Sequence, residues 1–151
     1  MKPEFAKYLS ADSIVVLAGT TKKEILEEIV AFAAPKSPID RNQMEDAVWK
    51  RERMMTTGVG MGLALPHIRV NGFGAPLVVV GICEKPVKDY KSIDNVPVRV
   101  AVFIAATEGE QDAYLKLLGS VSAKFKNADT IAKLIELKDD PAKVHKFLSR
   151  A

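Results

Sequence analysis

The sequence predicts a single three-layer α/β domain over residues 1–151, in which a mixed β-sheet lies between helices on both faces. Three observations support this fold class. Two nearly continuous apolar runs rich in valine, 76–83 and 98–105, have the composition of buried strands. Amphipathic helical patterns stand before and after these runs. A chain of 151 residues is also long enough to bury a core without disulfides.

The N-terminal part of the chain predicts two helices. Thr21 and Glu24 have capping-box spacing, and apolar residues then recur at helical intervals until Pro35 and Pro38. Asp40 has the chemistry of an N-cap for the second helix. The far end of that helix carries a basic cluster, where the helix dipole favours positive charge: Lys50, Arg51 and Arg53.

The middle of the chain predicts three strands, 59–65, 76–83 and 98–105. The segments 70–75 and 84–97 are rich in Gly, Pro, Asn and Asp, so we expect loops or short edge pieces there. Along the chain, the predicted strands therefore come after the second helix and before the C-terminal helices.

The C-terminal part predicts three helices. Thr107 and Glu110 have the spacing of a second capping box, and a leucine-rich helical stripe follows them through 114–125. A shorter helix is expected around 131–135, and Asp140 before Pro141 has N-cap and N1 chemistry for a last helix through Leu148.

Composition and charge exclude several function classes. The 22 basic and 19 acidic residues are interleaved, so a nucleic-acid partner is not indicated. No apolar run approaches the ~18 residues of a membrane span, and no direct membrane insertion is expected. The one cysteine, Cys83, lies in a buried strand pattern, which favours a reducing, cytoplasmic compartment. The scattered histidines and cysteine form no zinc-like ligand set, so we expect neither metal nor cofactor.

The candidate chemistry lies in residues 56–69. Gly58, Gly60 and Gly62 alternate, so in an extended strand they would leave one face bare and let a ligand approach the backbone. The spacing matches neither a dinucleotide fingerprint nor a P-loop. Pro66 fixes its own φ, so we expect His67 at a rigid strand-to-loop corner.

A held imidazole is suited to nucleophilic attack. With an ordinary pKa of about 6.5, the His67 side chain has a neutral lone pair that can attack phosphorus. Backbone N–H groups of the glycine segment, with Arg51 or Arg69, could stabilise the oxygens of the transferred group. The ordinary alternatives stay open on residues alone, since a lone histidine is usually solvated, alternating glycines often mark close packing, and surface arginines are often merely solvated.

The stretch 51–67 closely resembles the signature of the EIIA type-2 domain of the phosphoenolpyruvate-dependent phosphotransferase system. That family includes fructose and mannitol EIIA domains and nitrogen-regulatory EIIA proteins. The resemblance implies that His67 accepts a phosphoryl group from an HPr-type carrier protein. It further implies that the group passes to an EIIB domain, or serves as a signal to a regulated target protein, and that Arg51 positions the phosphate and the histidine.

Two residues depart from the family pattern. Tyr114 stands where a second histidine is common; its hydroxyl can donate a hydrogen bond but supplies no positive charge. Met61 stands where asparagine is frequent. Tyr114 leaves open an alternative function, a regulatory binding or sensor module that keeps the EIIA fold without phosphotransfer. The candidate phosphate-binding residues are Gly58, Gly60, Gly62, Arg69 and Tyr114.

Overall fold

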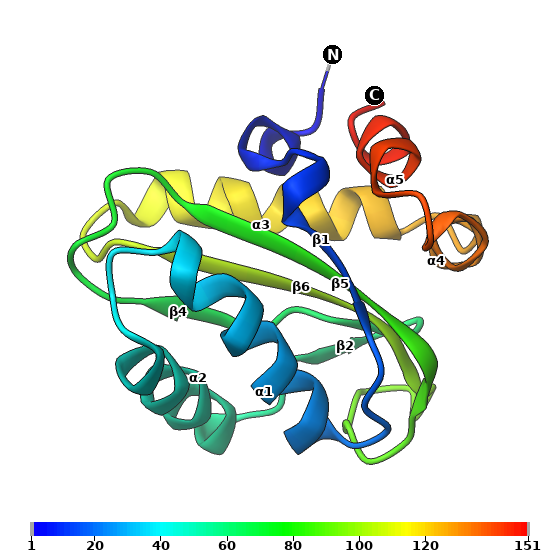
Figure 1. Cartoon of the computed structure of the whole chain (residues 1–151), viewed down its shortest axis with the longest axis horizontal. Helices are drawn as coiled ribbons and strands as arrows, with labels where there is room; N and C mark the ends of the chain where they lie inside the picture. Colours follow the sequence, from blue (N-terminus) through cyan, green and yellow to red (C-terminus); the bar gives the residue numbers. More distant parts are fainter. Residues whose placement is uncertain (1, 151) are drawn as a thin grey trace.

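A computed structural model describes residues 2–150 of the chain as a mixed sheet between two layers of helices (Figure 1). The sheet order is β1-β5-β6-β3-β2, and β4 also pairs with β6. β5 and β6 are antiparallel, whereas β1 is parallel to β5 and both β3 and β4 are parallel to β6. The predicted fold class is confirmed. The strands are β1 (Ile14–Leu17), β2 (Gly58–Gly60), β3 (Leu63–Ala64), β4 (His67–Arg69), β5 (Leu77–Val87) and β6 (Val98–Ala106).

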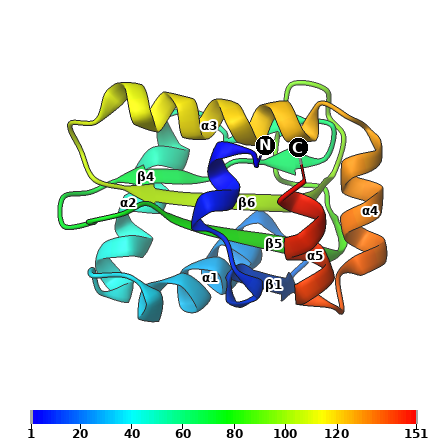
Figure 2. The same ribbon diagram turned by 90° about the horizontal axis from the view of Figure 1, so that it is seen from above.

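Helices cover both faces of the sheet (Figure 2). One face is covered by α1 (Lys22–Ala33) and α2 (Arg41–Met54). The other face is covered by a short 3₁₀ helix (Glu4–Tyr8), α3 (Gln111–Phe125), α4 (Asp129–Leu137) and α5 (Pro141–Leu148). The apolar side chains of β5 and β6 alternate between two buried clusters, one beneath α1 and α2 and the other beneath α3, α4 and α5. Both central strands are therefore buried on both faces, as their apolar sequences predict.

Most of the predicted helix starts are confirmed. The Thr21 side chain accepts the Glu24 N–H at 3.2 Å, and the Glu24 carboxylate accepts the Thr21 N–H in return at 3.2 Å. Asp40 caps α2 through the Gln43 N–H at 2.7 Å. The prediction of a second capping box is wrong, because α3 begins at Gln111 and no side chain caps it. Gly109 has a left-handed φ of +97°, which a first helical turn cannot contain.

The predicted strand 59–65 is also wrong. Gly60, Met61 and Gly62 have φ of 102°, 57° and 85°, so the chain turns sharply and forms the antiparallel pair β2–β3. The segment 84–87, predicted as a loop or short edge piece, continues β5. β1 and β4 were not predicted, and His67 is the first residue of β4 rather than part of a loop after a strand.

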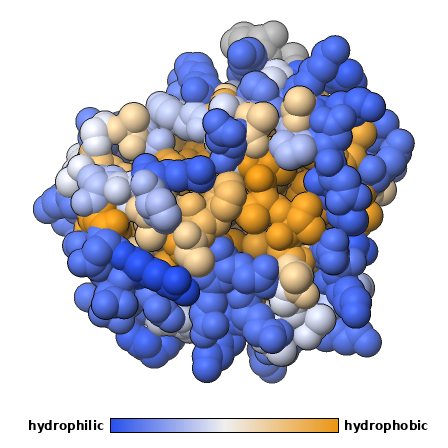
Figure 3. Space-filling view, viewed as in Figure 1, coloured by the Kyte–Doolittle hydropathy of each residue, from blue (hydrophilic) through white to orange (hydrophobic). Residues whose placement is uncertain are grey.

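One edge of the sheet is formed by β1. Val15 and Val16 are half-buried there, and hydrophobic side chains gather around the position of this strand on the face shown in Figure 3. The Glu28 carboxylate accepts the N–H groups of Ala18 and Gly19 at 2.9 and 2.6 Å, immediately after the strand. These bonds end the edge strand after four residues, and a short edge limits pairing with other chains.

The segment 88–97 lies across the β2–β3 hairpin. The Asp94 carboxylate accepts the Met61 N–H at 2.7 Å, and the Thr56 hydroxyl donates to the Lys91 carbonyl at 2.6 Å. A Cβ at Gly58 would overlap the Lys91 carbonyl oxygen, and one at Gly60 would lie 3.1 Å from Asp94. Glycine therefore allows the close approach between the hairpin and this segment.

We expect Gly58→Ala to lower the free energy of unfolding by about 1–3 kcal/mol, because the added Cβ meets backbone that cannot rotate away. Urea denaturation measures the change. Gly74→Ala is the matched control, since a Cβ there has no atom within 4 Å. Equal denaturation midpoints for the two variants would contradict the close packing of the hairpin.

Candidate functional site

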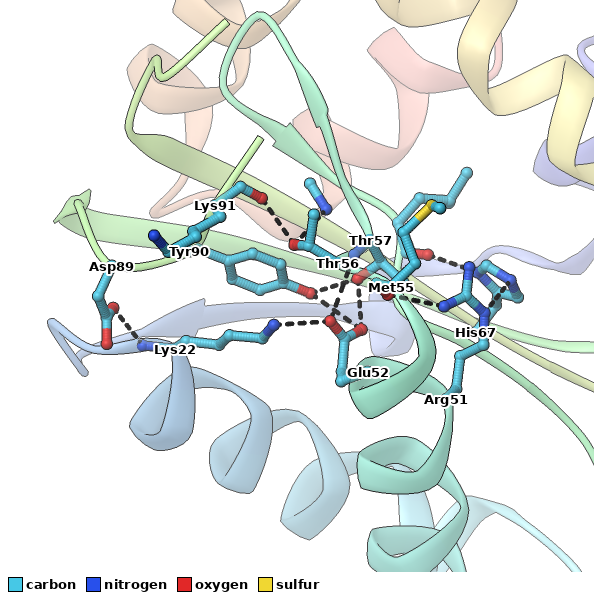
Figure 4. Close-up of polar contacts among 12 residues, drawn as sticks. Lys22, Arg51, Glu52, Met55, Thr56, Thr57, His67, Asp89, Tyr90 and Lys91 are labelled. Carbon is cyan, nitrogen blue, oxygen red and sulfur yellow. Dashed lines mark hydrogen bonds and ion pairs between the residues drawn. The ribbon is translucent and has the colours of Figure 1, made fainter. Parts of the chain in front are cut away.

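The imidazole of His67 is held through both of its nitrogens (Figure 4). Nδ1 lies 2.7 Å from the Leu65 carbonyl oxygen, and Arg51 Nε donates to Nε2 at 3.2 Å. Because a carbonyl oxygen only accepts, Nδ1 must carry the proton and Nε2 the lone pair. The half-buried ring therefore presents Nε2 as its nucleophilic atom.

The surroundings of His67 keep its imidazole neutral. Burial lowers the pKa of His67 below its usual value, and the nearby positive charge of Arg51 acts in the same direction. The Leu65 carbonyl and the Glu52 carboxylate oppose this effect without reversing it. The Nε2 lone pair is therefore free of a proton at neutral pH.

Arg51 reaches His67 from the last turn of α2. Its NH1 group donates to the Met55 carbonyl oxygen at 2.8 Å, while Nε faces the imidazole. Carbonyls at a helix C-terminus lack intrahelical partners, so this bond satisfies one of them and fixes the guanidinium. The structure thus brings together Arg51 and His67, as the sequence resemblance implies.

Tyr114 and Arg69 complete the surroundings of the imidazole. The rings of Tyr114 and His67 have centroids 6.0 Å apart and are tilted by 58°. The Arg69 guanidinium lies 4.9 Å above the Tyr114 ring and donates to Gln111 at 2.6 Å. Burial raises the pKa of Tyr114 to about 12, so its hydroxyl remains a donor.

Two polar atoms beside the imidazole lack a partner. Tyr114 is 7% exposed, yet its hydroxyl forms no hydrogen bond with any residue of 2–150, and the same holds for Nε of Arg69. Buried donors without partners are uncommon in native proteins. Both donors therefore have unused hydrogen-bonding capacity.

An open groove runs past His67 between α2, β4 and the start of α3. Its lining has more positive than negative side chains: Lys50, Arg51 and Arg69 against Glu108. Gly58, Gly60 and Gly62 do not line this groove, and segment 88–97 packs where side chains at Gly58 and Gly60 would lie. The bare glycine face expected from the sequence is filled by the protein's own chain.

Comparisons with known proteins relate the chain to one protein family. Residues 7–151 match the family described as the phosphoenolpyruvate-dependent sugar phosphotransferase system, EIIA 2. The chain belongs to this family. A nitrogen regulatory protein from Pseudomonas aeruginosa is 31% identical over 118 residues, which cover 78% of this chain and 76% of the relative.

Two solved structures show the same fold as this EIIA 2 chain. The nitrogen regulatory protein IIA-Ntr from Neisseria meningitidis superposes with a TM-score of 0.88 at 22% identity, covering 95% of this chain and 98% of the other. Enzyme IIAMTL from Escherichia coli, solved in complex with phosphorylated enzyme IIBMTL, gives a TM-score of 0.73 at 19% identity, with coverages of 92% and 97%. Within residues 2–150, no helix is both long and apolar enough to cross a membrane.

Sequence reasoning about this EIIA 2 chain missed a buried polar cluster beside the site, formed by Lys22, Glu52, Thr57 and Tyr90. Its central residue, Glu52, is 7% exposed. One signal for it was present in the sequence, because Glu52 follows Met44 and Val48 at four-residue spacing on the buried stripe of α2. A charged residue on such a stripe indicates a buried partner.

Proposed function

We propose that this EIIA 2 chain is a phosphocarrier that accepts a phosphoryl group on Nε2 of His67. The observation that carries the proposal is the imidazole itself, whose Nδ1 proton is committed to Leu65 and whose Nε2 lone pair faces Arg51 at the groove. The proposed donor is the phosphohistidine of an HPr-type protein. The single buried thiol, Cys83, fits a reducing compartment, so we place the exchange in the cytoplasm.

The chemical step balances without a cofactor. The Nε2 lone pair attacks phosphorus, a new N–P bond forms, and the N–P bond of the donor breaks with its electron pair returning to the donor imidazole. The proton of His67 stays on Nδ1 throughout, in its hydrogen bond to the Leu65 carbonyl oxygen. In onward transfer, the recipient nucleophile attacks the phosphorus, and the N–P bond to His67 breaks with its electron pair returning to Nε2.

Arg51 has two tasks in this proposal. Its Nε releases Nε2 when the phosphoryl group arrives, and the guanidinium, still held by the Met55 carbonyl, then faces the phosphoryl oxygens. Tyr114 Oη and Arg69 Nε are proposed as further donors to those oxygens, since both lack partners. Gly58, Gly60 and Gly62 would contribute indirectly, by shaping the hairpin that leads into Leu65.

The printed names of the relatives support two recipients. The Pseudomonas relative and the Neisseria structure are nitrogen regulatory proteins, which favours use of the phosphoryl group as a signal to a target protein. The complex of IIAMTL with phosphorylated IIBMTL supports an EIIB domain as a recipient. The alternative, a binding module that has lost phosphotransfer, rests on Tyr114 alone.

Intact-mass analysis after incubation with phosphoenolpyruvate, enzyme I and an HPr-type carrier tests the proposal. We expect one acid-labile phosphoryl adduct on the wild-type chain, because a phosphoramidate hydrolyses in acid. No adduct with any carrier would instead support the binding module without phosphotransfer.

We expect Tyr114→Phe to slow phosphoryl acceptance about tenfold, the effect of losing one hydrogen bond to a charged group. Stability should stay within about 0.5 kcal/mol, because the deleted hydroxyl has no protein partner. Rapid-quench transfer from the phosphorylated carrier measures the rate, and Tyr114→His, which restores a donor, is the control. An unchanged rate in Tyr114→Phe would assign Tyr114 to packing alone.

A further inference from the structure

The carboxylate of Glu52 is buried and fully bonded. Its side chain is 2% exposed, and Lys22 Nζ lies 2.8 Å from Oε1. Oε1 also accepts the Thr57 N–H at 3.3 Å, and Oε2 accepts the Thr57 hydroxyl. The Tyr90 hydroxyl lies 2.5 Å from the Thr57 hydroxyl oxygen and 3.4 Å from Oε2. One carboxylate therefore joins three separate parts of the chain (Figure 4).

Lys22, the counter-charge, is itself held in place. It is the first residue of α1, and its backbone N–H donates to Asp89 at 2.7 Å. Its ammonium group lies 4.7 Å from the centre of the Tyr90 ring, which is buried beneath it. The pair thus connects α1, the end of α2, the β2–β3 hairpin and the segment after β5.

A chain of hydrogen bonds leads from Glu52 to the imidazole. Glu52 accepts the Thr57 N–H, the Thr57 carbonyl accepts the Leu65 N–H at 2.9 Å, and the Leu65 carbonyl accepts the Nδ1 proton of His67 at 2.7 Å. On the other side of the ring, Arg51, which precedes Glu52, donates to Nε2. Both bonds that hold the ring therefore depend on the segment 51–57.

Packing alone does not explain a charge at this position. Residue 52 continues the buried stripe of α2, where an apolar side chain would fill the same space. A buried ion pair is often no more stabilising than apolar residues of similar volume, because both charges lose their hydration. What the carboxylate adds is a set of directed bonds that fix the hairpin relative to α2.

We propose that Glu52, with Lys22 as its counter-charge, is a positioning residue for phosphoryl acceptance, acting through Thr57 and Leu65 to fix the tautomer and orientation of His67. This inference rests on the proposed phosphocarrier function. Glu52 does not contact the phosphoryl group in this arrangement, since its oxygens are occupied by Lys22, Thr57 and Tyr90.

Glu52→Gln and the double variant Lys22→Met/Glu52→Gln test the proposal. We expect nitrogen chemical shifts of the His67 ring to change from the single Nδ1–H tautomer to a mixture, and transfer from the phosphorylated carrier to slow about 10–100-fold. The double variant leaves no unpaired ammonium, so its unfolding midpoint should exceed that of Glu52→Gln while its transfer stays slow.

Thr130→Val is the matched control. Thr130 is 3% exposed and donates to the Lys124 carbonyl at 3.0 Å, on the helical layer opposite α1 and α2. It should lower stability and leave both the tautomer and the transfer rate unchanged. If Glu52→Gln behaves like Thr130→Val, Glu52 is only structural. The tautomer measurement requires no phosphorylation, so it decides this question even if the wild-type chain accepts no phosphoryl group.

Discussion

Replacing His67 with alanine should abolish the phosphoryl adduct completely. The variant removes the one imidazole that lies in the basic groove and has its lone pair directed at a guanidinium. No other nucleophile can use that arrangement, because Tyr114 Oη stays protonated with its pKa raised to about 12. Intact-mass analysis with the full donor system measures the adduct directly.

His145→Ala is the control for this result. His145 lies in α5, in the helical layer opposite α1 and α2, and is also half-buried. Its side chain forms no hydrogen bond within residues 2–150 that would fix one tautomer. The control should accept a full phosphoryl group. An adduct that persists in His67→Ala, or disappears in His145→Ala, would overturn the site assignment.

The features that the sequence predicted correctly depend on neighbouring residues. The Thr21–Glu24 capping box and the Asp40 cap form because both partners lie within one helical turn. The same spacing at Thr107 and Glu110 does not cap α3, because a left-handed glycine at 109 intervenes. Spacing alone therefore predicts a cap only where the intervening backbone is helical.

The features that the sequence missed depend on distant contacts. The turn at Met61 is held by Asp94, which lies in a different segment of the chain. Because the local sequence does not reveal this contact, the alternating glycines predicted an extended strand. The short strands β1 and β4 exist because they pair with β5 and β6. Glu52 is explained only by Lys22 and Tyr90, whose positions follow from the folded arrangement of α1 and the segment after β5.

Removing the guanidinium of Arg51 should slow phosphoryl acceptance about 10²–10³-fold, the usual effect of deleting one preorganised donor from a charged transition state. Arg51→Met removes the donor to Nε2, the bond to the Met55 carbonyl and the charge facing the phosphoryl oxygens. The pKa of His67 should rise, because the positive charge of Arg51 helps to lower it. Burial of the imidazole still lowers this pKa in the variant. A proton then competes for Nε2 as the pH falls, which slows the reaction further in acid.

Arg51→Lys separates charge from geometry. An ammonium group keeps the positive charge but cannot serve the Met55 carbonyl and the imidazole with two fixed donors, as the guanidinium does. Its transfer rate should therefore lie between those of Arg51→Met and the wild type, while the pKa of His67 stays near the wild-type value. Rapid-quench kinetics and an NMR titration of His67 measure the two effects. Wild-type rates in Arg51→Met would show that the guanidinium stabilises only the resting imidazole and takes no part in transfer.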